Sequence, residues 1–156
     1  MDLSVVIPVY NEAENLPLLA DALLKALGDL KITWEVILVD DGSADASVKI
    51  LEDLAAQYAS WMRVILLRRN FGQTTAIEAG IDHAQGEIIV LMDADLQNDP
   101  ADIQMMLDKI NEGYDVVSGW RINRQDTFIT RTLPSRMANG LISWVTGVHL
   151  HDYGCT

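Results

Sequence analysis

The sequence contains one cysteine, Cys155, among its 156 residues. A single thiol excludes a disulfide within the chain and suits a reducing compartment. Long apolar runs are also missing, because each run is well below the roughly 18 residues that cross a bilayer as a helix. No secretory signal pattern precedes the first strand-like segment. These absences predict a chain without a transmembrane segment that works on the cytoplasmic side.

Basic residues are scarce: 11 lysines and arginines stand against 23 aspartates and glutamates, which gives a net charge of −12. Such a field repels the phosphate backbone and disfavours nucleic-acid binding. An anionic ligand would have to be held by a metal ion, by helix N-termini or by clustered arginines. The sequence also lacks a Gly-x-Gly-x-x-Gly run and a Walker-type lysine, which disfavours dinucleotide-binding and P-loop folds.

What the sequence does contain is an alternation of strand-like and helix-like segments. The length and the 49% hydrophobic content suit a single domain over residues 1–156. We expect an α/β fold with a mostly parallel sheet and helices on both faces. The first helix, over residues 12–27, would place Leu24 among its inward-facing residues and end at Gly28. The expected strands cover 3–9, 34–39, 64–67, 88–92 and 115–118, and the other helices cover 46–58, 74–83 and 100–110.

Two of these apolar runs end in carboxylates: Asp40 and Asp41 follow residues 36–39, while Asp93 and Asp95 follow residues 88–92. Apolar runs of this kind predict strands that are buried on both faces. Open α/β sheets bind ligands beyond the carboxyl ends of their strands. Crowded carboxylates repel one another unless a cation or hydrogen-bond donors compensate them. We therefore expect one shared crevice that holds a metal ion and a nucleotide.

The second acidic group suits a hard cation. In an extended segment Asp93, Asp95 and Gln97 would project to the same side. Two carboxylates and an amide oxygen are ligands that Mg²⁺ or Mn²⁺ prefers. The competing interpretation is a solvated acidic turn, with Asp99 capping the helix that begins at Pro100.

The first acidic group suits a nucleoside. Gly42 permits a sharp turn, and a carboxylate beside it can accept hydrogen bonds from a base or a ribose. Tyr10 offers a flat face for stacking on a base, with polar edges from Asn11 and Glu12. The competing interpretation is that these residues only begin helices, with Asn11 as one N-cap and Ser43 or Asp45 as the other.

Four segments occur in the order seen in family 2 glycosyltransferases of the GT-A fold, and the chain resembles the polyprenyl-phosphate (dolichol-phosphate mannosyltransferase-like) subfamily most. These segments are residues 4–12, 39–43, 69–73 and 93–97. The resemblance implies a Rossmann-like nucleotide-diphospho-sugar transferase whose residues 1–119 bind the donor. It implies that Tyr10 stacks on the base and Asp41 accepts from it, in a nucleotide pocket completed by Pro8, Glu12, Asp40, Gly42 and Asp93. It also implies that Asp93, Asp95 and Gln97 hold the metal.

Arginines gather after residue 119, at Arg121, Arg124, Arg131 and Arg136. Guanidinium groups bind phosphate in a bidentate manner. The resemblance implies that they face a lipid-phosphate acceptor, with Arg121 and Arg131 the favoured contacts. A solvated basic loop is the competing interpretation, and Arg136 equally suits the end of the following helix.

The last portion of the chain, residues 120–156, would form the acceptor side. Apolar residues recur at helical spacing over 134–148, which fits a packing helix or one that lies on a membrane surface. Relatives of this kind usually continue into transmembrane helices, so we expect the chain to be part of a longer protein. Asp152 matches a segment near the acceptor. It would act as a base only toward a hydroxyl acceptor, because a phosphomonoester is largely dianionic near pH 7.

These features predict a metal-dependent glycosyltransferase at the cytoplasmic face of a membrane, and the resemblance implies that the displacement is inverting. Its donor would be a UDP- or GDP-sugar, its acceptor a polyprenyl phosphate, and its catalytic residues Asp95, Arg121 and Asp152. One alternative is a nucleotide-sugar-binding protein without turnover. Another is a Mg²⁺-binding receiver domain, although Arg121 stands where a lysine is expected. A haloacid-dehalogenase-type phosphatase is disfavoured because Gln97 occupies the position of a threonine or valine.

Overall fold

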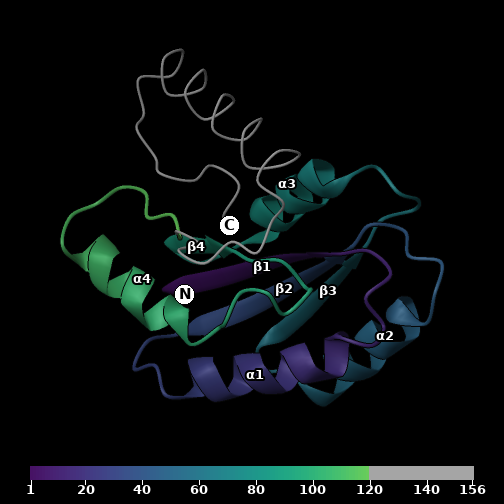
Figure 1. Cartoon of the computed structure of the whole chain (residues 1–156), viewed down its shortest axis with the longest axis horizontal. Helices are drawn as coiled ribbons and strands as arrows, with labels where there is room; N and C mark the ends of the chain where they lie inside the picture. The colour runs from purple at the N-terminus through teal and green to yellow at the C-terminus, as the bar shows by residue number, and fades with distance from the viewer. Residues whose placement is uncertain (120–156) are drawn as a thin grey trace, which may run out of the picture. The chain divides into compact units, whose positions relative to one another are not determined.

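The computed structural model describes residues 1–119, which form a parallel α/β fold (Figure 1). The sheet has the order β3-β2-β1-β4, and each neighbouring pair is parallel. The predicted α/β class and parallel sheet are therefore confirmed. The strands are β1 (Leu3–Val9), β2 (Trp34–Asp40), β3 (Met62–Leu66) and β4 (Ile88–Leu91). The helices are α1 (Leu16–Gly28), α2 (Ser47–Gln57), α3 (Gln73–His83) and α4 (Asp102–Asn111).

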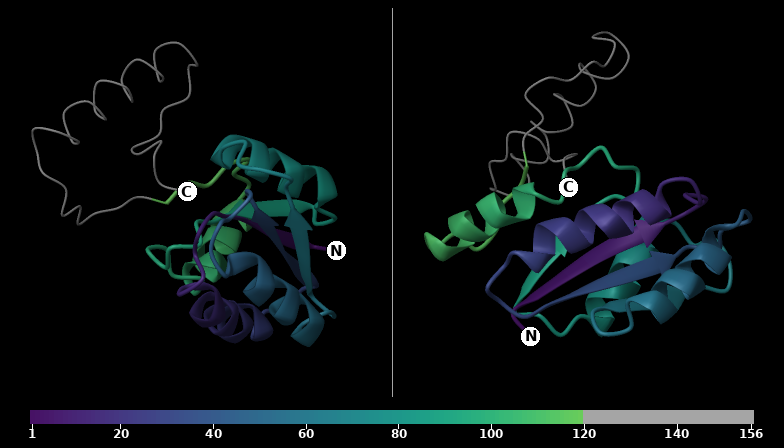
Figure 2. Two further views of the ribbon diagram at one scale, coloured as in Figure 1. Left: turned by 90° about the vertical axis from the view of Figure 1, so that its right-hand side faces the viewer. Right: turned by 90° about the horizontal axis from the view of Figure 1, so that it is seen from below.

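Helices cover both faces of the sheet, with α1 and α2 on one side and α3 on the other (Figures 1 and 2). The alternation of side chains along β1 explains this arrangement. Leu3, Val5 and Ile7 join a large buried cluster with residues of α1, α2 and α4. Val6 points to the opposite face and joins a smaller cluster with Ala76 of α3. The loops after β1, β2 and β3 consequently meet at the carboxyl edge of the sheet.

Four expectations about the elements need correction, apart from shifts of one or two residues at the ends of other elements. Helix α1 begins at Leu16 and not at residue 12, because residues 13–15 form a turn in which Glu12 O accepts from the backbone N–H groups of Asn15 and Leu16. Leu24 lies outside the buried stripe of this helix and is 39% exposed. Strand β4 is only half-buried, so its apolar run does not indicate burial on both faces.

The fourth correction concerns residues 115–118, which form no strand. Val116 is 71% exposed. A run with only two apolar residues offers little surface to bury, and this explains why the pattern was not sufficient to form a strand.

A buried polar cluster fastens the turn between α3 and β4 to the three strands beyond it. Glu35 of β2, which is 4% exposed, accepts from Ser4 Oγ of β1 at 2.7 Å. It also accepts from Arg63 of β3 and from Gln85 N of the turn. The backbone N–H of Gly86 donates to Ser4 Oγ at 2.8 Å, and a Cβ at Gly86 would lie 2.4 Å from Ser4 N. The start of β4 is thus held in place by one carboxylate at the end of the sheet opposite the acidic loops.

We predict that Glu35→Gln lowers the free energy of unfolding at pH 7 by about 2 kcal/mol, because an amide group would leave buried donors without an acceptor. Burial raises the pKa of Glu35, but hydrogen bonds from Ser4, Gln85 and Arg63 outweigh it and the pKa lies below its usual value. A carboxyl with a lowered folded-state pKa stabilises the fold above its unfolded-state pKa and loses this contribution as the pH falls through the folded-state pKa. Urea unfolding from pH 7 down to about pH 3 should therefore show the difference between the two proteins shrink.

The exposed Glu52 of α2 offers a matched control, and Glu52→Gln should unfold like the wild type at every pH. A Glu35→Gln protein as stable as the wild type at pH 7 would contradict this role for the cluster.

Candidate functional site

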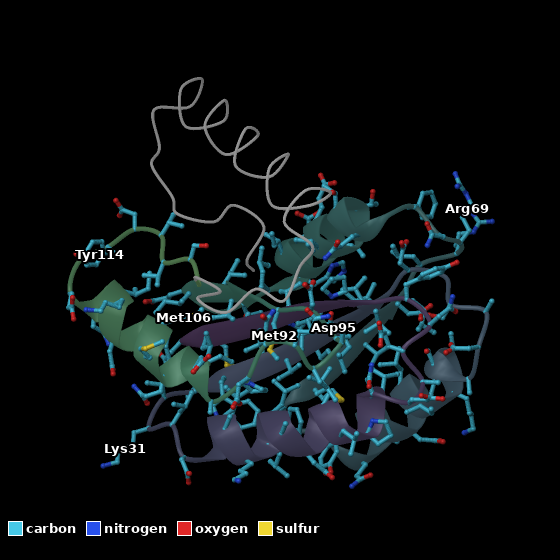
Figure 3. All side chains as sticks on the ribbon, viewed as in Figure 1. Lys31, Arg69, Met92, Asp95, Met106 and Tyr114 are labelled. Atoms are coloured by element: carbon cyan, nitrogen blue, oxygen red, sulfur yellow. The ribbon has the colours of Figure 1, made fainter. Side chains whose placement is uncertain are left out.

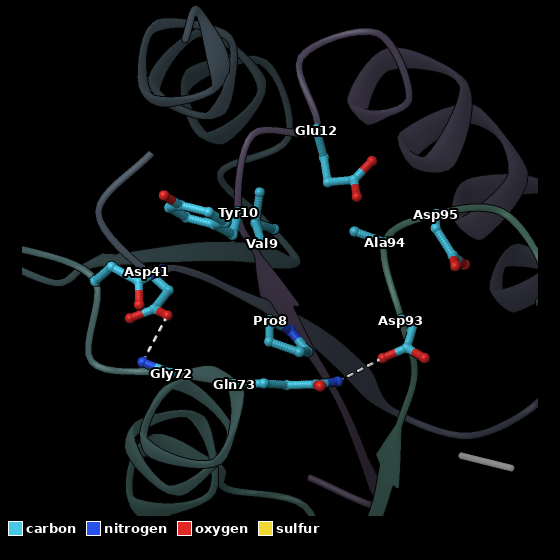
Figure 4. Close-up of a pocket in the computed structure, with 11 residues that line it drawn as sticks. Pro8, Val9, Tyr10, Glu12, Asp41, Gly72, Gln73, Asp93, Ala94 and Asp95 are labelled. Atoms are coloured by element: carbon cyan, nitrogen blue, oxygen red, sulfur yellow. Dashed lines mark hydrogen bonds between the residues drawn. The ribbon is translucent and has the colours of Figure 1, made fainter. Parts of the chain in front are cut away.

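A pocket of about 390 Å³ opens at the carboxyl edge of the sheet, and both acidic strand ends line it (Figure 4). The expected shared crevice is therefore present, with Asp41 on one side and Asp93 and Asp95 on the other. The sequence predicted this because parallel strands end at the same edge. The lining residues are Pro8, Val9, Tyr10, Glu12, Asp41, Asn70, Gly72, Gln73, Asp93, Ala94 and Asp95.

Hydrogen bonds join the loop after β1 to the loop after β2. Asn11, whose φ is +56°, accepts from Ala44 N through Oδ1 at 2.8 Å, and its own N–H donates to Ser43 Oγ at 2.9 Å. The N–H of Glu12 donates to Ser47 Oγ at 2.9 Å. Asn11 and Ser43 therefore link two loops and do not cap helices, which corrects the competing interpretation for both.

Asp45 does act at the start of α2, because its carboxylate accepts from the N–H of Ser47 at 2.9 Å. A second oxygen accepts from Ala13 N at 3.2 Å, so Asp45 takes part in the link between the loops as well. Three hydrogen bonds to backbone N–H groups of Asn11, Glu12 and Ala13 thus fix the segment that carries Tyr10.

The adjacent aspartates at the end of β2 have different surroundings. Asp40 is 1% exposed and does not line the pocket; its Oδ2 accepts from the N–H groups of Gly42 and Ser43, both at 3.0 Å. Gly42 has a φ of +72°, and a Cβ there would lie 2.4 Å from the carbonyl carbon of Arg69. Neither residue lines the pocket, where the resemblance had placed both. Asp40 and Gly42 instead stabilise the turn that follows β2.

Asp41 lines the pocket and also holds the segment that precedes α3. Its Oδ1 accepts from Phe71 N at 2.7 Å and its Oδ2 from Gly72 N at 2.9 Å. This contact joins residues thirty positions apart, and sequence reasoning missed it. The segment at residues 69–73 had contributed to the family resemblance, but nothing in its composition assigned it a partner.

Tyr10 and Glu12 both line the pocket. Tyr10 is 49% exposed at the pocket wall, so one ring face is available for stacking. Glu12 accepts from Asn15 Nδ2 at 2.6 Å, and this contact holds its carboxylate beside the pocket. Pro8 completes the wall between the two acidic groups (Figure 4).

The segment after β4 bends instead of running straight. Leu96 has a φ of +61°, and Asp95 Oδ1 accepts from Gln97 N at 3.0 Å across the turn. The expectation that Asp93, Asp95 and Gln97 project to one side assumed an extended segment, and the bend corrects that assumption. Gln97 does not line the pocket, and its role as a metal ligand stays a prediction. Within residues 1–119 no group of three or more His, Cys, Asp or Glu side chains is arranged to hold a metal. The candidate donors are Asp93 and Asp95. Asp99 accepts from Ala101 N at 2.9 Å, as expected of a residue that precedes α4.

Several predicted residues lie outside the part of the chain that the structure describes. They are Arg121, Arg124, Arg131, Arg136, Asp152 and the helix expected over 134–148. Among the described residues, no helix is long and apolar enough to span a membrane. Figure 3 shows Arg69 at the end of the sheet opposite Lys31, on the side of the pocket. Its guanidinium carbon lies 4.1 Å from the centre of the Phe71 ring.

Known proteins resemble this chain in sequence and in fold. It is 44% identical over 157 residues to a dodecaprenyl-phosphate galacturonate synthase of Rhizobium johnstonii, covering 100% of the chain and 46% of that protein. It is 49% identical over 152 residues to an undecaprenyl-phosphate 4-deoxy-4-formamido-L-arabinose transferase of an Enterobacter species, covering 97% and 46% respectively. The chain thus spans about half the length of these curated relatives.

The crystal structure of residues 1–349 of S. aureus TarS superposes with a TM-score of 0.60 at 24% identity, covering 81% of this chain and 38% of that one. The predicted GT-A type of α/β fold is confirmed by this likeness. The profile of glycosyl transferase family 2 matches residues 4–153, and the chain therefore belongs to glycosyl transferase family 2.

Proposed function

We propose that the protein carrying this chain transfers a sugar from a nucleotide diphosphate donor to a polyprenyl phosphate at the cytoplasmic face of a membrane. The observation that carries the proposal is the meeting of Asp41, Asp93 and Asp95 with Tyr10 in one pocket. The names of the relatives, which are polyprenyl-phosphate sugar synthases and transferases, support the acceptor class.

The nucleoside would bind against the wall formed by Tyr10 and Asp41. Stacking on the Tyr10 ring suits any base, because every base has a flat π-face. Each oxygen of Asp41 already accepts one backbone N–H. A carboxylate has about four acceptor sites, so it can accept another hydrogen bond from an N–H of uracil or guanine. UDP- and GDP-linked donors both fit this wall.

Mg²⁺ or Mn²⁺ would bind at Asp93 and Asp95. Two carboxylates are hard oxygen donors, and with so few protein ligands the remaining positions are left for phosphate and water oxygens. When bound, the ion neutralises the charge that develops on the departing diphosphate. Asp93 and Asp95 would hold the ion in the same pocket as Tyr10 and Asp41, so that one donor molecule would contact both acidic groups.

The acceptor phosphate would be oriented by residues 120–156, which with the donor-binding residues 1–119 form one catalytic domain. Four of the chain's 11 basic residues are the arginines at 121, 124, 131 and 136. A phosphomonoester is largely dianionic near pH 7, so the nucleophile requires positioning more than deprotonation. Arg121 would position it directly, and Asp152 would act as a base only for a hydroxyl acceptor. The displacement is a single inverting step.

We predict that Tyr10→Ala weakens the binding of UDP or GDP by about tenfold, the lower part of the range for losing one stacked base. Isothermal titration in the presence of Mn²⁺ measures the dissociation constant. Tyr114→Ala is a matched control because this tyrosine is 58% exposed and does not line the pocket. Equal affinity of the Tyr10→Ala and Tyr114→Ala proteins would exclude the proposed base position.

We also predict that Asp93→Asn and Asp95→Asn each lower turnover roughly a hundredfold, the scale of losing a metal contact or a charge-stabilising group. Turnover is measured as the release of nucleotide diphosphate in the presence of polyprenyl phosphate. The assay uses the complete protein that carries this chain. Chelation by EDTA should abolish turnover of the wild type, and the exposed Asp21→Asn should remain fully active. Turnover that persists in EDTA and in both variants would refute metal-dependent transfer at this pocket.

A further inference from the structure

Three consecutive residues, 71–73, connect the two acidic sides of the pocket. The carboxylate of Asp41 accepts from the N–H groups of Phe71 and Gly72. The next residue, Gln73, donates through Nε2 to Asp93 Oδ1 at 2.8 Å (Figure 4). A hydrogen-bonded path therefore runs from the end of β2 to the end of β4 without any charged donor.

The position of Gln73 is fixed by the packing of α3, of which it is the first residue. Gly72 precedes the helix with a φ of +98°, and its N–H donates to Asp41 Oδ2. Further along α3, Ala76 is fully buried, and a Cβ added at Gly80 would lie 2.3 Å from Val6 Cγ1. Because α3 lies this close to β1, its first turn is held in place. This position lets the Gln73 side chain donate to Asp93.

Of the two glutamines near the acidic segment, Gln73 has the contact with the pocket. Gln97 was the expected partner of the carboxylates, but it does not line the pocket. Gln73 reaches the same acidic group from a different element, lines the pocket and touches Asp93.

We propose that Gln73 is a positioning residue for the cation: it holds Oδ1 of Asp93 and thereby orients the carboxylate as a metal ligand. This inference rests on the proposed function, in which Asp93 and Asp95 bind Mg²⁺ or Mn²⁺. Groups that hydrogen-bond to ligating carboxylates orient them, and their loss typically weakens metal binding by roughly 10–100-fold.

The neutrality of the glutamine is part of the argument. A lysine or arginine in this place would also donate to Asp93, but its charge would cancel the attraction between the carboxylates and a divalent ion. An amide donor fixes the side chain and leaves its negative charge intact.

The test is Mn²⁺ binding to the complete protein without nucleotide or acceptor, measured from the electron paramagnetic resonance signal of the free ion. Gln73→Met keeps the length of the side chain and removes the donor, so we expect the dissociation constant to rise about tenfold. Gln73→Lys keeps a donor and adds a charge, and it should bind Mn²⁺ more weakly still. Gln57→Met, at an exposed position at the end of α2, should bind as the wild type does.

Each outcome separates the inference from the function on which it rests. A wild type that binds no Mn²⁺ would overturn the proposed metal site together with this role of Gln73. A wild type that binds Mn²⁺ and a Gln73→Met protein that binds it equally well would overturn the role of Gln73 alone. A third outcome is a Gln73→Met protein that binds Mn²⁺ more weakly and whose metal-free form also unfolds at a lower temperature than the wild type. This result would assign Gln73 to the fold and would also overturn the proposal.

Discussion

The structure depends on holding several carboxylates together at one edge of a sheet without neutralising them. Carboxylates at this spacing repel one another, and a cationic side chain would relieve the repulsion at the cost of the negative field. Neutral donors contact these carboxylates: backbone N–H groups for Asp40, Asp41 and Asp95, and an amide side chain for Asp93. In the proposed function the negative charge of the site would attract a cation that also binds an anionic ligand. At the opposite end of the sheet, where no ligand is proposed, Glu35 is paired with Arg63.

This constraint explains why several loop residues between strands and helices make specific contacts. Asn11 adopts a positive φ and, with Ser43 and Ser47, joins the loops that carry Tyr10 and Asp41. Gly42 allows the turn after β2 to approach the backbone at Arg69, which brings residues 70–73 within reach of Asp41. The proposed base-binding side and the proposed cation-binding side of the pocket are thus joined by hydrogen bonds.

The fold was largely predictable because apolar residues recur with the spacing that suits a buried helix or strand. The pattern of β1 and the run of leucines in α1 set both the element types and the layers they join. Predictions failed where a pattern was too short or lay next to a turn. Residues 115–118 have too little apolar surface to form a strand, and the residues just before Leu16, which were expected to be helical, form a turn. The pocket was predictable from the parallel strand ends, but the bend between Asp95 and Gln97 was not, because nothing in the sequence indicated the positive φ of Leu96. The contacts of Asp41 and Gln73 join distant segments, and only the folded arrangement reveals them.

Membership of glycosyl transferase family 2 gives the pocket a chemical context, and the geometry of the chain suggests how its two acidic sides share one donor. The most direct test of this account is an experimental structure of the protein with a nucleotide diphosphate and Mn²⁺. The account predicts the ion bound to Asp93 and Asp95, the diphosphate on that ion, and the base against Tyr10 and within hydrogen-bonding distance of Asp41. A nucleotide bound elsewhere, or a diphosphate turned away from Asp93 and Asp95, would contradict it.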